Sequence, residues 1–143
     1  MAGKDNCAAS ADPECRGDEW ILVVDDDRSQ CKSIRMSLEH FGYQVTAVTE
    51  GDLAIRLFEE AARSGGESPF DLVFIDMVLG GTDGLDTLKK ILYFFPAQKA
   101  IVSTGYADED RCAATIEMGA AWLSKPFRIH ELVQAVRSRL DRS

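Results

Sequence analysis

The chain has 143 residues, a length that suits one domain, and its 45% hydrophobic content is sufficient for a single core. Its formal net charge of −8 disfavours a nucleic-acid surface, because binding phosphates requires clustered lysine and arginine side chains. No stretch approaches the roughly 20 apolar residues that span a bilayer, and no signal peptide is present, so we expect a cytoplasmic protein without a nucleic-acid or membrane partner.

The first 18 residues mix Gly, Pro, Ala, Ser and charged residues without an apolar period. Burial cannot offset the ordering entropy of such a segment. We therefore expect a disordered leader over 1–18 and one folded domain over 19–143. The cysteines show neither CxxC spacing nor the density of a disulfide scaffold, and we expect reduced thiols at Cys7, Cys15, Cys31 and Cys112.

Beyond the leader, short β-rich runs alternate with segments that have a helical apolar period. The first of these segments has apolar residues at spacings of three and four, typical of a helix that lays one face on a sheet: Cys31, Ile34, Leu38 and Phe41. The segment 129–140 repeats this pattern, and only three residues follow it in the sequence. We therefore expect no output domain after it. Strands are expected near residues 20–24, 44–48, 71–75, 99–103 and 121–124.

This alternation of five strands with five helices predicts an α/β fold. Right-handed crossovers give a doubly wound, flavodoxin-like parallel sheet with helices on both faces. We expect the strand order 2-1-3-4-5, in which ligands bind beyond the carboxyl ends of strands one and three. The loop 64–69 enters the third strand at the opposite end, so we expect it to bulge away from that crevice.

Acidic residues follow two of the expected strands. The run 21–24 leads into Asp25 and Asp26, and the run 72–75 leads into Asp76. Under the expected strand order the three carboxylates share one crevice, where their mutual repulsion calls for a bound cation. Mg²⁺ suits such oxygen ligands, and Asp76 is the candidate nucleophile toward phosphorus.

Other expected strands end at the same rim with residues that suit a phosphoryl group. Lys125, after the fifth strand, supplies a positive charge to neutralise the transferring oxygens. Thr104, at the end of the fourth strand, offers a hydroxyl group, and Gly105 leaves room for the approach.

Four motifs, in order and at sensible separations, resemble those of a known family. They are VVDDD at 23–27, DLVFIDMVLGGTDGL at 71–85, STGYAD at 103–108 and WLSKPF at 122–127. Together they make the segment from about 20 to 140 similar to the response-regulator receiver domain, the CheY-like family of bacterial two-component systems.

The resemblance implies a phosphorylation site. Asp76 would accept a phosphoryl group from the phosphohistidine of a histidine kinase or phosphotransfer domain. Mg²⁺ would be held by Asp25, Asp26, Asp76 and the backbone carbonyl of Val78. Lys125 would pair with the phosphoryl group. A receiver of this kind is not an enzyme beyond its own phosphorylation from phosphohistidine or small phosphodonors.

The resemblance also implies a switch. Thr104 would move toward the phosphoryl group and Trp122 would follow it inward, with Tyr106 as the alternative switch aromatic. The surface of the fourth helix, fifth strand and fifth helix would then meet a protein output partner, in a monomer or a phosphorylation-dependent dimer. Relatives typically have a cis peptide bond at the position of Lys125-Pro126.

The chain departs from the family pattern at three places. In the segment 118–122, one residue fewer than usual separates the Gly-Ala pair from the aromatic residue Trp122. We therefore expect a changed register where the fourth helix ends. Gly80 stands where proline is common, and Val78 is apolar where many relatives are polar. These positions affect loop stiffness and phosphoryl lifetime.

Structural roles compete with chemical ones at several acids. Asp26 or Asp27 could cap the helix that begins near residue 28. Asp83 and Gly84 fit a turn before a helix. The lone histidines lack metal-ligand spacing and are expected on the surface at His40 and His130.

Two other functions compete with a phosphorylation switch. An aspartyl-phosphate phosphatase of the haloacid dehalogenase type also places acids at strand ends, but its DxD motif fits the segment 25–29 poorly. A receiver that is never phosphorylated could serve as a constitutive docking piece. The sequence leaves open a free-standing regulator or a terminal receiver cut from a hybrid kinase.

Overall fold

The computed structural model describes residues 15–105 and 109–141. Cys7 and Tyr106 lie outside this part of the chain, as do the first 14 residues of the expected leader. The elements are β1 (Trp20–Val24), α2 (Arg28–His40), β2 (Gln44–Val48), α3 (Gly51–Arg63), β3 (Leu72–Asp76), β4 (Val78–Leu79), β5 (Thr82–Asp83), α4 (Gly84–Phe94), β6 (Lys99–Thr104), α5 (Glu109–Glu117), β7 (Ala121–Ser124) and α6 (Ile129–Asp141).

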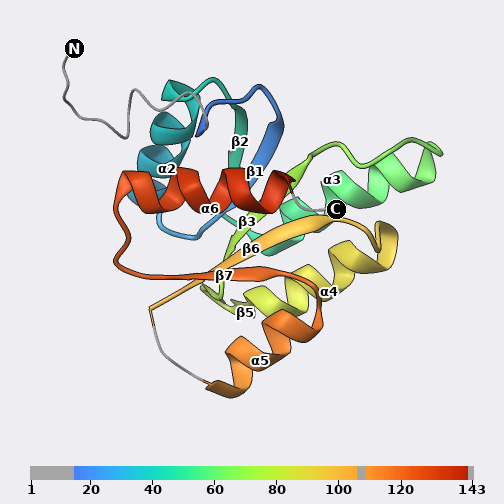
Figure 1. Ribbon diagram of the computed structural model, residues 1–143. Coiled ribbons are helices and arrows are strands. Elements are labelled where there is room, and N and C mark those ends of the chain that lie inside the picture. The colour runs from blue at the N-terminus through green and yellow to red at the C-terminus, as the bar shows by residue number, and fades with distance from the viewer. Residues whose placement is uncertain (1–14, 106–108, 142–143) are drawn as a thin grey trace, which may run out of the picture.

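Five strands form one parallel sheet in the order β2-β1-β3-β6-β7, as Figure 1 shows. Counted along the chain, this is the predicted order 2-1-3-4-5, which confirms the doubly wound fold with five helices. β3 is paired on both sides and all five of its residues are buried, because both faces of the sheet are covered.

The helices cover the two faces of the sheet and enclose two apolar cores. α2 and α6 pack on one face, where alternate β1 residues such as Ile21 and Val23 meet helix residues such as Leu38 and Val136. α3 and α4 pack on the other face, where the intervening β1 residues point. Because successive side chains of β1 point to opposite faces of the sheet, this strand contributes residues to both cores.

Aspartate side chains cap the amino ends of α2 and α4, two helices that begin near the carboxyl ends of the strands. Asp27 accepts hydrogen bonds from the backbone N–H groups of Ser29 and Gln30 at 2.9 and 3.2 Å, and so caps α2. Asp83 accepts one from Leu85 at 2.8 Å and caps α4, in agreement with the structural interpretation. Asp26 is therefore not needed as a cap.

A small antiparallel hairpin, which the sequence analysis did not anticipate, follows β3. β4 and β5 pair Val78 with Asp83 and Leu79 with Thr82, leaving Gly80 and Gly81 as the turn. A Gly-Gly pair between two short strands is a known hairpin signal. The hairpin folds back closely, since a Cβ at Gly84 would collide with the carbonyl oxygen of Asp76.

The packed domain begins before the expected boundary at residue 19. Cys15 is buried, its carbonyl oxygen accepts a hydrogen bond of 2.8 Å from the Tyr43 hydroxyl, and the Gly17 N–H donates to Phe41 at 3.1 Å. Residues 15–18, which the sequence analysis placed in the leader, thus contact the folded part of the chain. Composition could not reveal this, because the contacts come from distant residues.

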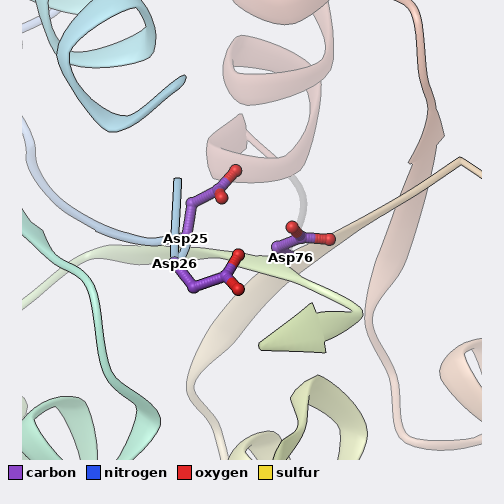
Figure 2. A group of neighbouring side chains, drawn as sticks. All are labelled: Asp25, Asp26 and Asp76. Atoms are coloured by element: carbon purple, nitrogen blue, oxygen red, sulfur yellow. The ribbon is translucent and has the colours of Figure 1, made fainter. Parts of the chain in front are cut away.

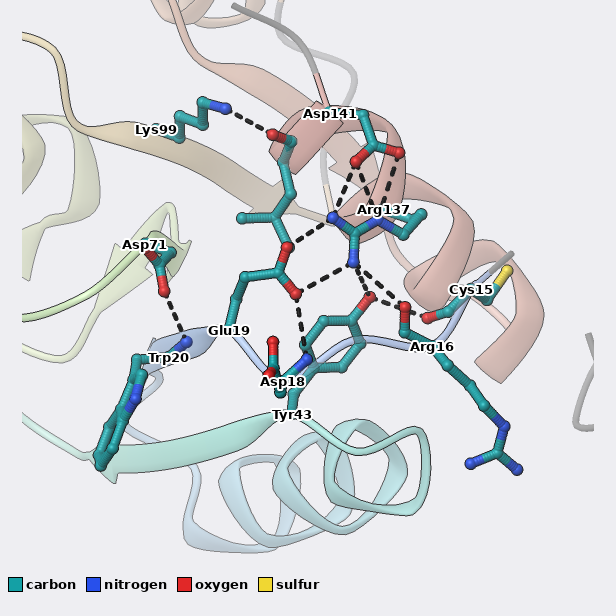
Figure 3. A network of polar contacts seen from close by, with 11 residues as sticks. Cys15, Arg16, Asp18, Glu19, Trp20, Tyr43, Asp71, Lys99, Arg137 and Asp141 are labelled. Carbon is teal, nitrogen blue, oxygen red and sulfur yellow. Dashed lines mark hydrogen bonds and ion pairs between the residues drawn. The ribbon is translucent and has the colours of Figure 1, made fainter. Parts of the chain in front are cut away.

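A group of polar side chains at the amino ends of the strands anchors this segment (Figure 3). We call Glu19, Tyr43, Arg137 and Asp141 the amino-end cluster. Arg137 of α6 lies 2.5 Å from Glu19 and 2.8 Å from Asp141, and it also donates to the carbonyl oxygen of Arg16 at 3.2 Å. These contacts tie the residues before β1 to the last helix.

The loop 64–69 lies at the amino ends of the strands, as expected. Its Ser68 contacts Gln98, and both line a cavity of about 520 Å³ together with Phe70 and Phe95. Among the described residues, no helix has both the length and the apolar character required to cross a bilayer.

Candidate functional site

Three carboxylates meet at the carboxyl ends of β1 and β3. Asp25 and Asp26 follow β1 directly and Asp76 ends β3, and Figure 2 shows their side chains side by side. Each contributes an oxygen atom, and these oxygens lie within 4.8 Å of one another. We call these residues the acid cluster. The strand order brings them together, as predicted, because β1 and β3 are neighbours.

The three acids differ in burial. Asp25 is 1% exposed and Asp76 is 8% exposed, whereas Asp26 is an exposed residue. Two charges are thus largely removed from water, which is costly unless a cation compensates them. The exposed Asp26 leaves the cluster open to ions and phosphorylated molecules from solution.

Lys125 supplies positive charge to the cluster. Its Nζ lies 3.2 Å from Oδ2 of Asp76 and 3.7 Å from Oδ2 of Asp25. β7 places it there, because Thr104 pairs with Ser124 and the Lys125 N–H donates to the Thr104 carbonyl oxygen at 2.8 Å. One ammonium facing three carboxylates leaves the group of four with net negative charge.

Asp25 is the least satisfied of the three acids, because Lys125 reaches its Oδ2 only as an ion pair at 3.7 Å. Its Oδ1 accepts a hydrogen bond of 2.9 Å from the Asp27 N–H, but its buried Oδ2 has no hydrogen-bond partner among the described residues. Burial raises the pKa of Asp25, and the charge of Asp76 adds to this effect. The donor set of carboxylate oxygens with one orphaned oxygen fits a hard cation such as Mg²⁺.

Asp76 stands at the centre of the rim. Its Oδ1 accepts a 3.2 Å hydrogen bond from the N–H of Val78, and its Oδ2 faces Lys125. Val78 is 60% exposed, and because its side chain is apolar, only its backbone offers ligand atoms to the cluster. Asp76 combines partial access from solvent with a cation beside it.

The remaining predicted residues take separate places along β6 and β7. Thr104 ends β6 and is buried, next to Ser103, whose register partner is Asp76. Gly105 is exposed, and no described residue would lie within 4 Å of a Cβ at this position. Trp122 lies on β7, paired with Val102 and 40% exposed, and it does not belong to the acid cluster.

The structure adds Cys31 to the surroundings of the site. Its thiol donates to the carbonyl oxygen of Asp25 at 3.0 Å, and burial raises the pKa of this thiol. Cys31 was predicted only as an apolar position of its helix. No local sequence signal marks it as a neighbour of Asp25, because the contact arises when α2 packs on β1.

Among the described residues, Cys15, Cys31 and Cys112 form no disulfide bond. The peptide bond between Lys125 and Pro126 is cis, as in the typical relatives. The short path at the end of α5 is accommodated by Gly119, which has a φ of +81°, and by a hydrogen bond of 3.1 Å from the Ala120 N–H to the Thr115 carbonyl oxygen.

The fold and the acid cluster define a class: a doubly wound, flavodoxin-like α/β protein with a cation-competent acidic site at the strand-order switch point. Comparison with known proteins gives the family. The family model of the response regulator receiver domain matches residues 21–137. The chain belongs to this family, the receiver domains of two-component systems.

Curated relatives are longer proteins. The chain is 34% identical over 113 residues to the transcriptional regulatory protein ZraR of Klebsiella oxytoca, covering 78% of this chain and 24% of that protein. It is 34% identical over 124 residues to the probable transcriptional regulatory protein TcrX of Mycobacterium tuberculosis, covering 86% and 50%. The chain thus spans between a quarter and a half of the length of these relatives.

Solved structures share the fold. A CheY-like receiver domain protein from Methanospirillum hungatei has a TM-score of 0.77 at 28% identity, covering 87% of this chain and 95% of that one. A response regulator from Burkholderia pseudomallei, solved with a phosphorylated aspartic acid, calcium ion and citrate, has a TM-score of 0.70 at 26% identity, covering 87% and 67%.

Proposed function

We propose that this receiver accepts a phosphoryl group on Asp76 from the phosphohistidine of a histidine kinase or phosphotransfer domain. The observation that carries the proposal is the position of Asp76 between two neighbouring carboxylates and Lys125, whose Nζ lies 3.2 Å away. This arrangement has an acceptor oxygen, a group that neutralises phosphoryl charge and a set of metal ligands in one place.

Asp25, Asp26 and Asp76 would hold Mg²⁺ together with the backbone carbonyl of Val78. When bound, the ion neutralises charge on the transferring phosphoryl oxygens. A calcium ion and a phosphorylated aspartic acid occur together in the structure of the similar Burkholderia protein, which supports this assignment. The orphaned Oδ2 of Asp25 supports it independently.

In the transfer step, a carboxylate oxygen of Asp76 forms a bond to phosphorus while the bond from phosphorus to the histidine nitrogen breaks. The imidazole leaves with that electron pair and takes a proton from water. Lys125 stabilises the phosphoryl oxygens electrostatically, and the hydroxyl of Thr104 donates to one of them after it moves toward Asp76.

The output would be a protein contact rather than a turnover of substrate. The α5-β7-α6 surface exposes apolar side chains, since Ile116 is 60%, Trp122 40% and Ile129 56% exposed. We propose that this surface meets a protein partner or a second copy of the receiver once Thr104 and Trp122 move. The net charge of −8 supports protein contact rather than direct DNA binding.

Incubation with acetyl phosphate and Mg²⁺ tests the proposal. The wild-type protein should gain one phosphoryl mass, and Asp76→Asn should gain none. Asp27→Asn is the matched control, because asparagine caps a helix as well as aspartate and residue 27 lies outside the acid cluster. Retention of the added mass in Asp76→Asn contradicts the assignment, and multiple turnover of a small phosphate ester would indicate a phosphatase instead.

A further inference from the structure

Arg111 on α5 makes an ion pair with Asp83 of β5, across a gap in sequence of 28 residues. The pair links two parts of the chain that flank Asp76 from different sides: α5 follows β6, whereas β5 belongs to the hairpin that follows β3. Figure 1 shows β5 near α4 and α5. Asp83 lies in the motif at 71–85, but Arg111 lies outside all four motifs, and neither residue belongs to the acid cluster.

A continuous set of contacts runs from Asp76 to this ion pair. The Asp76 carboxylate accepts from the Val78 N–H at 3.2 Å, and Val78 is the register partner of Asp83 in the hairpin. The Gly84 N–H donates to the Met77 carbonyl oxygen at 2.7 Å and closes the hairpin beside Asp76. Asp83 is therefore connected with the Asp76 carboxylate through a short series of backbone contacts in the hairpin.

Asp83 has two tasks that use different oxygens. Its Oδ1 accepts from the Leu85 N–H and caps α4, whereas its Oδ2 faces Nη2 of Arg111. The first contact needs only an oxygen acceptor, and the second needs a negative charge. An asparagine at this position keeps the cap and removes the charge, so the chain offers a clean way to separate them.

The position of α5 depends strongly on this contact, because α5 buries fewer side chains than α4. Among the α5 residues whose side chains are described, Thr115 is the buried one, whereas α4 buries Leu85, Leu88 and Ile91 among others. A helix with few buried apolar residues opens and shifts at low cost. Loss of an ion pair near its start therefore changes the position of α5 measurably.

We propose that Arg111 is a positioning residue for the phosphorylation of Asp76. Its ion pair with Asp83 holds the start of α5 against the β4–β5 hairpin while Asp76 is unmodified, and the pair is released in the phosphorylated conformation. This inference rests on the proposed function. Movement of Thr104 toward Asp76 draws the start of α5 along, and the Arg111–Asp83 pair opposes that movement.

The pair should therefore lower the population of the phosphorylation-competent conformation. Both side chains are about one-third exposed, at 36% and 33%, so water screens the pair and its effect is modest. Removing it should raise the competent population, and with it the rate of phosphorylation by acetyl phosphate, by about threefold.

A double-mutant cycle tests the inference. Arg111→Ala and Asp83→Asn should each accelerate labelling by about threefold, and the double variant should be no faster than either, because both remove the same pair. Arg111→Lys should restore most of the wild-type rate. Arg56→Ala, an exposed arginine of α3, is the control and should leave the rate unchanged.

Hydrogen exchange of the unphosphorylated protein gives a second measurement. The α5 amides should exchange about threefold faster in Arg111→Ala and in Asp83→Asn, and at the wild-type rate in Arg56→Ala. Slower labelling in Arg111→Ala, additive effects in the double variant, or unchanged α5 exchange would each overturn the inference.

The two measurements separate this inference from the proposed function. If the wild-type protein is not labelled, the proposed function is wrong and the role of Arg111 in phosphorylation falls with it. If the wild-type protein is labelled normally and the variants behave like it, only the role of Arg111 is wrong.

Discussion

Two charged clusters lie at opposite ends of the same sheet. At the carboxyl ends, the acid cluster sets three carboxylates against Lys125. At the amino ends, the amino-end cluster sets Arg137 between Glu19 and Asp141. Both draw on residues far apart in the chain, and both include side chains largely removed from water.

The clusters differ in how well each charge is satisfied. Arg137 donates to both acids and to the Arg16 carbonyl oxygen, and its hydrogen bonds hold the pKa of Glu19 below its ordinary value. Burial instead raises the pKa of Asp25, whose Oδ2 lacks a hydrogen bond within the described chain. A satisfied cluster stabilises the fold, whereas an unsatisfied one is ready to bind a cation.

The largest expected effect is the loss of Mg²⁺ affinity when a carboxylate of the acid cluster is removed. Asp25→Asn should weaken Mg²⁺ binding about 100-fold, because it removes the charge of a buried ligand; loss of an outer-shell partner alone typically costs 10- to 100-fold. Titration calorimetry measures the affinity. Asp27→Asn is the matched control and should bind Mg²⁺ like the wild type. An affinity within threefold of the wild type in Asp25→Asn would contradict a role for this carboxylate in metal binding.

A smaller effect is expected on stability when the amino-end cluster loses Arg137. Arg137→Ala should lower the free energy of unfolding by about 2 kcal/mol, because it removes charged hydrogen bonds to the partly buried Glu19 and a hydrogen bond to the Arg16 carbonyl oxygen. Denaturant unfolding measures this change. Arg63→Ala removes the exposed Arg63–Glu59 pair of α3 and should cost no more than about 0.5 kcal/mol. Equal losses in the two variants would mean that burial adds nothing to the amino-end cluster.

The smallest effect sharpens the comparison through pH. Folding raises the pKa of Asp25, so without metal the Asp25 carboxyl group holds a proton more tightly in the folded state than in the unfolded state. Asp25 therefore lowers the stability of the folded state as the pH rises above its ordinary pKa of 3.8. Because folding lowers the pKa of Glu19, its contribution is present above its ordinary pKa of 4.5 and is lost as the pH falls below that value.

Thermal unfolding between pH 3 and pH 7 checks both signs. Relative to the wild type, metal-free Asp25→Asn should gain stability as the pH rises, and Glu19→Gln should lose stability over the same range. Added Mg²⁺ should stabilise the wild type toward neutral pH and leave Asp25→Asn unaffected. Parallel pH profiles for all three proteins would contradict the contrast between the clusters.

Much of the site could be predicted because its residues stand at the ends of strands. The alternation of apolar runs and helical periods predicted a doubly wound parallel sheet, and the flavodoxin-like strand order expected for it brings Asp25, Asp26 and Asp76 to one edge. Lys125 followed from the same reasoning. Local signals also indicated the cap at Asp27, whereas at Asp83 they indicated only a turn before the helix that Asp83 caps.

Other features could not be predicted because they depend on packing between distant segments. The ordered residues 15–18 are held by Tyr43 and Arg137, and no local composition records that contact. The hairpin after β3 had a signal in its Gly-Gly turn that we did not use. Cys31 reaches Asp25 only after α2 has docked on the sheet.

The sequence by itself determined the family, the fold and the identity of the three acids, because periodicity and strand-end position are local properties that a parallel sheet converts into proximity. Only the tertiary structure decided how each charge is satisfied. Asp25 is left with an orphaned oxygen, Arg137 is surrounded by acceptors, and Arg111 meets Asp83 across 28 residues. Burial and hydrogen-bond geometry arise from all the packed elements together, so they become defined only when the chain is folded.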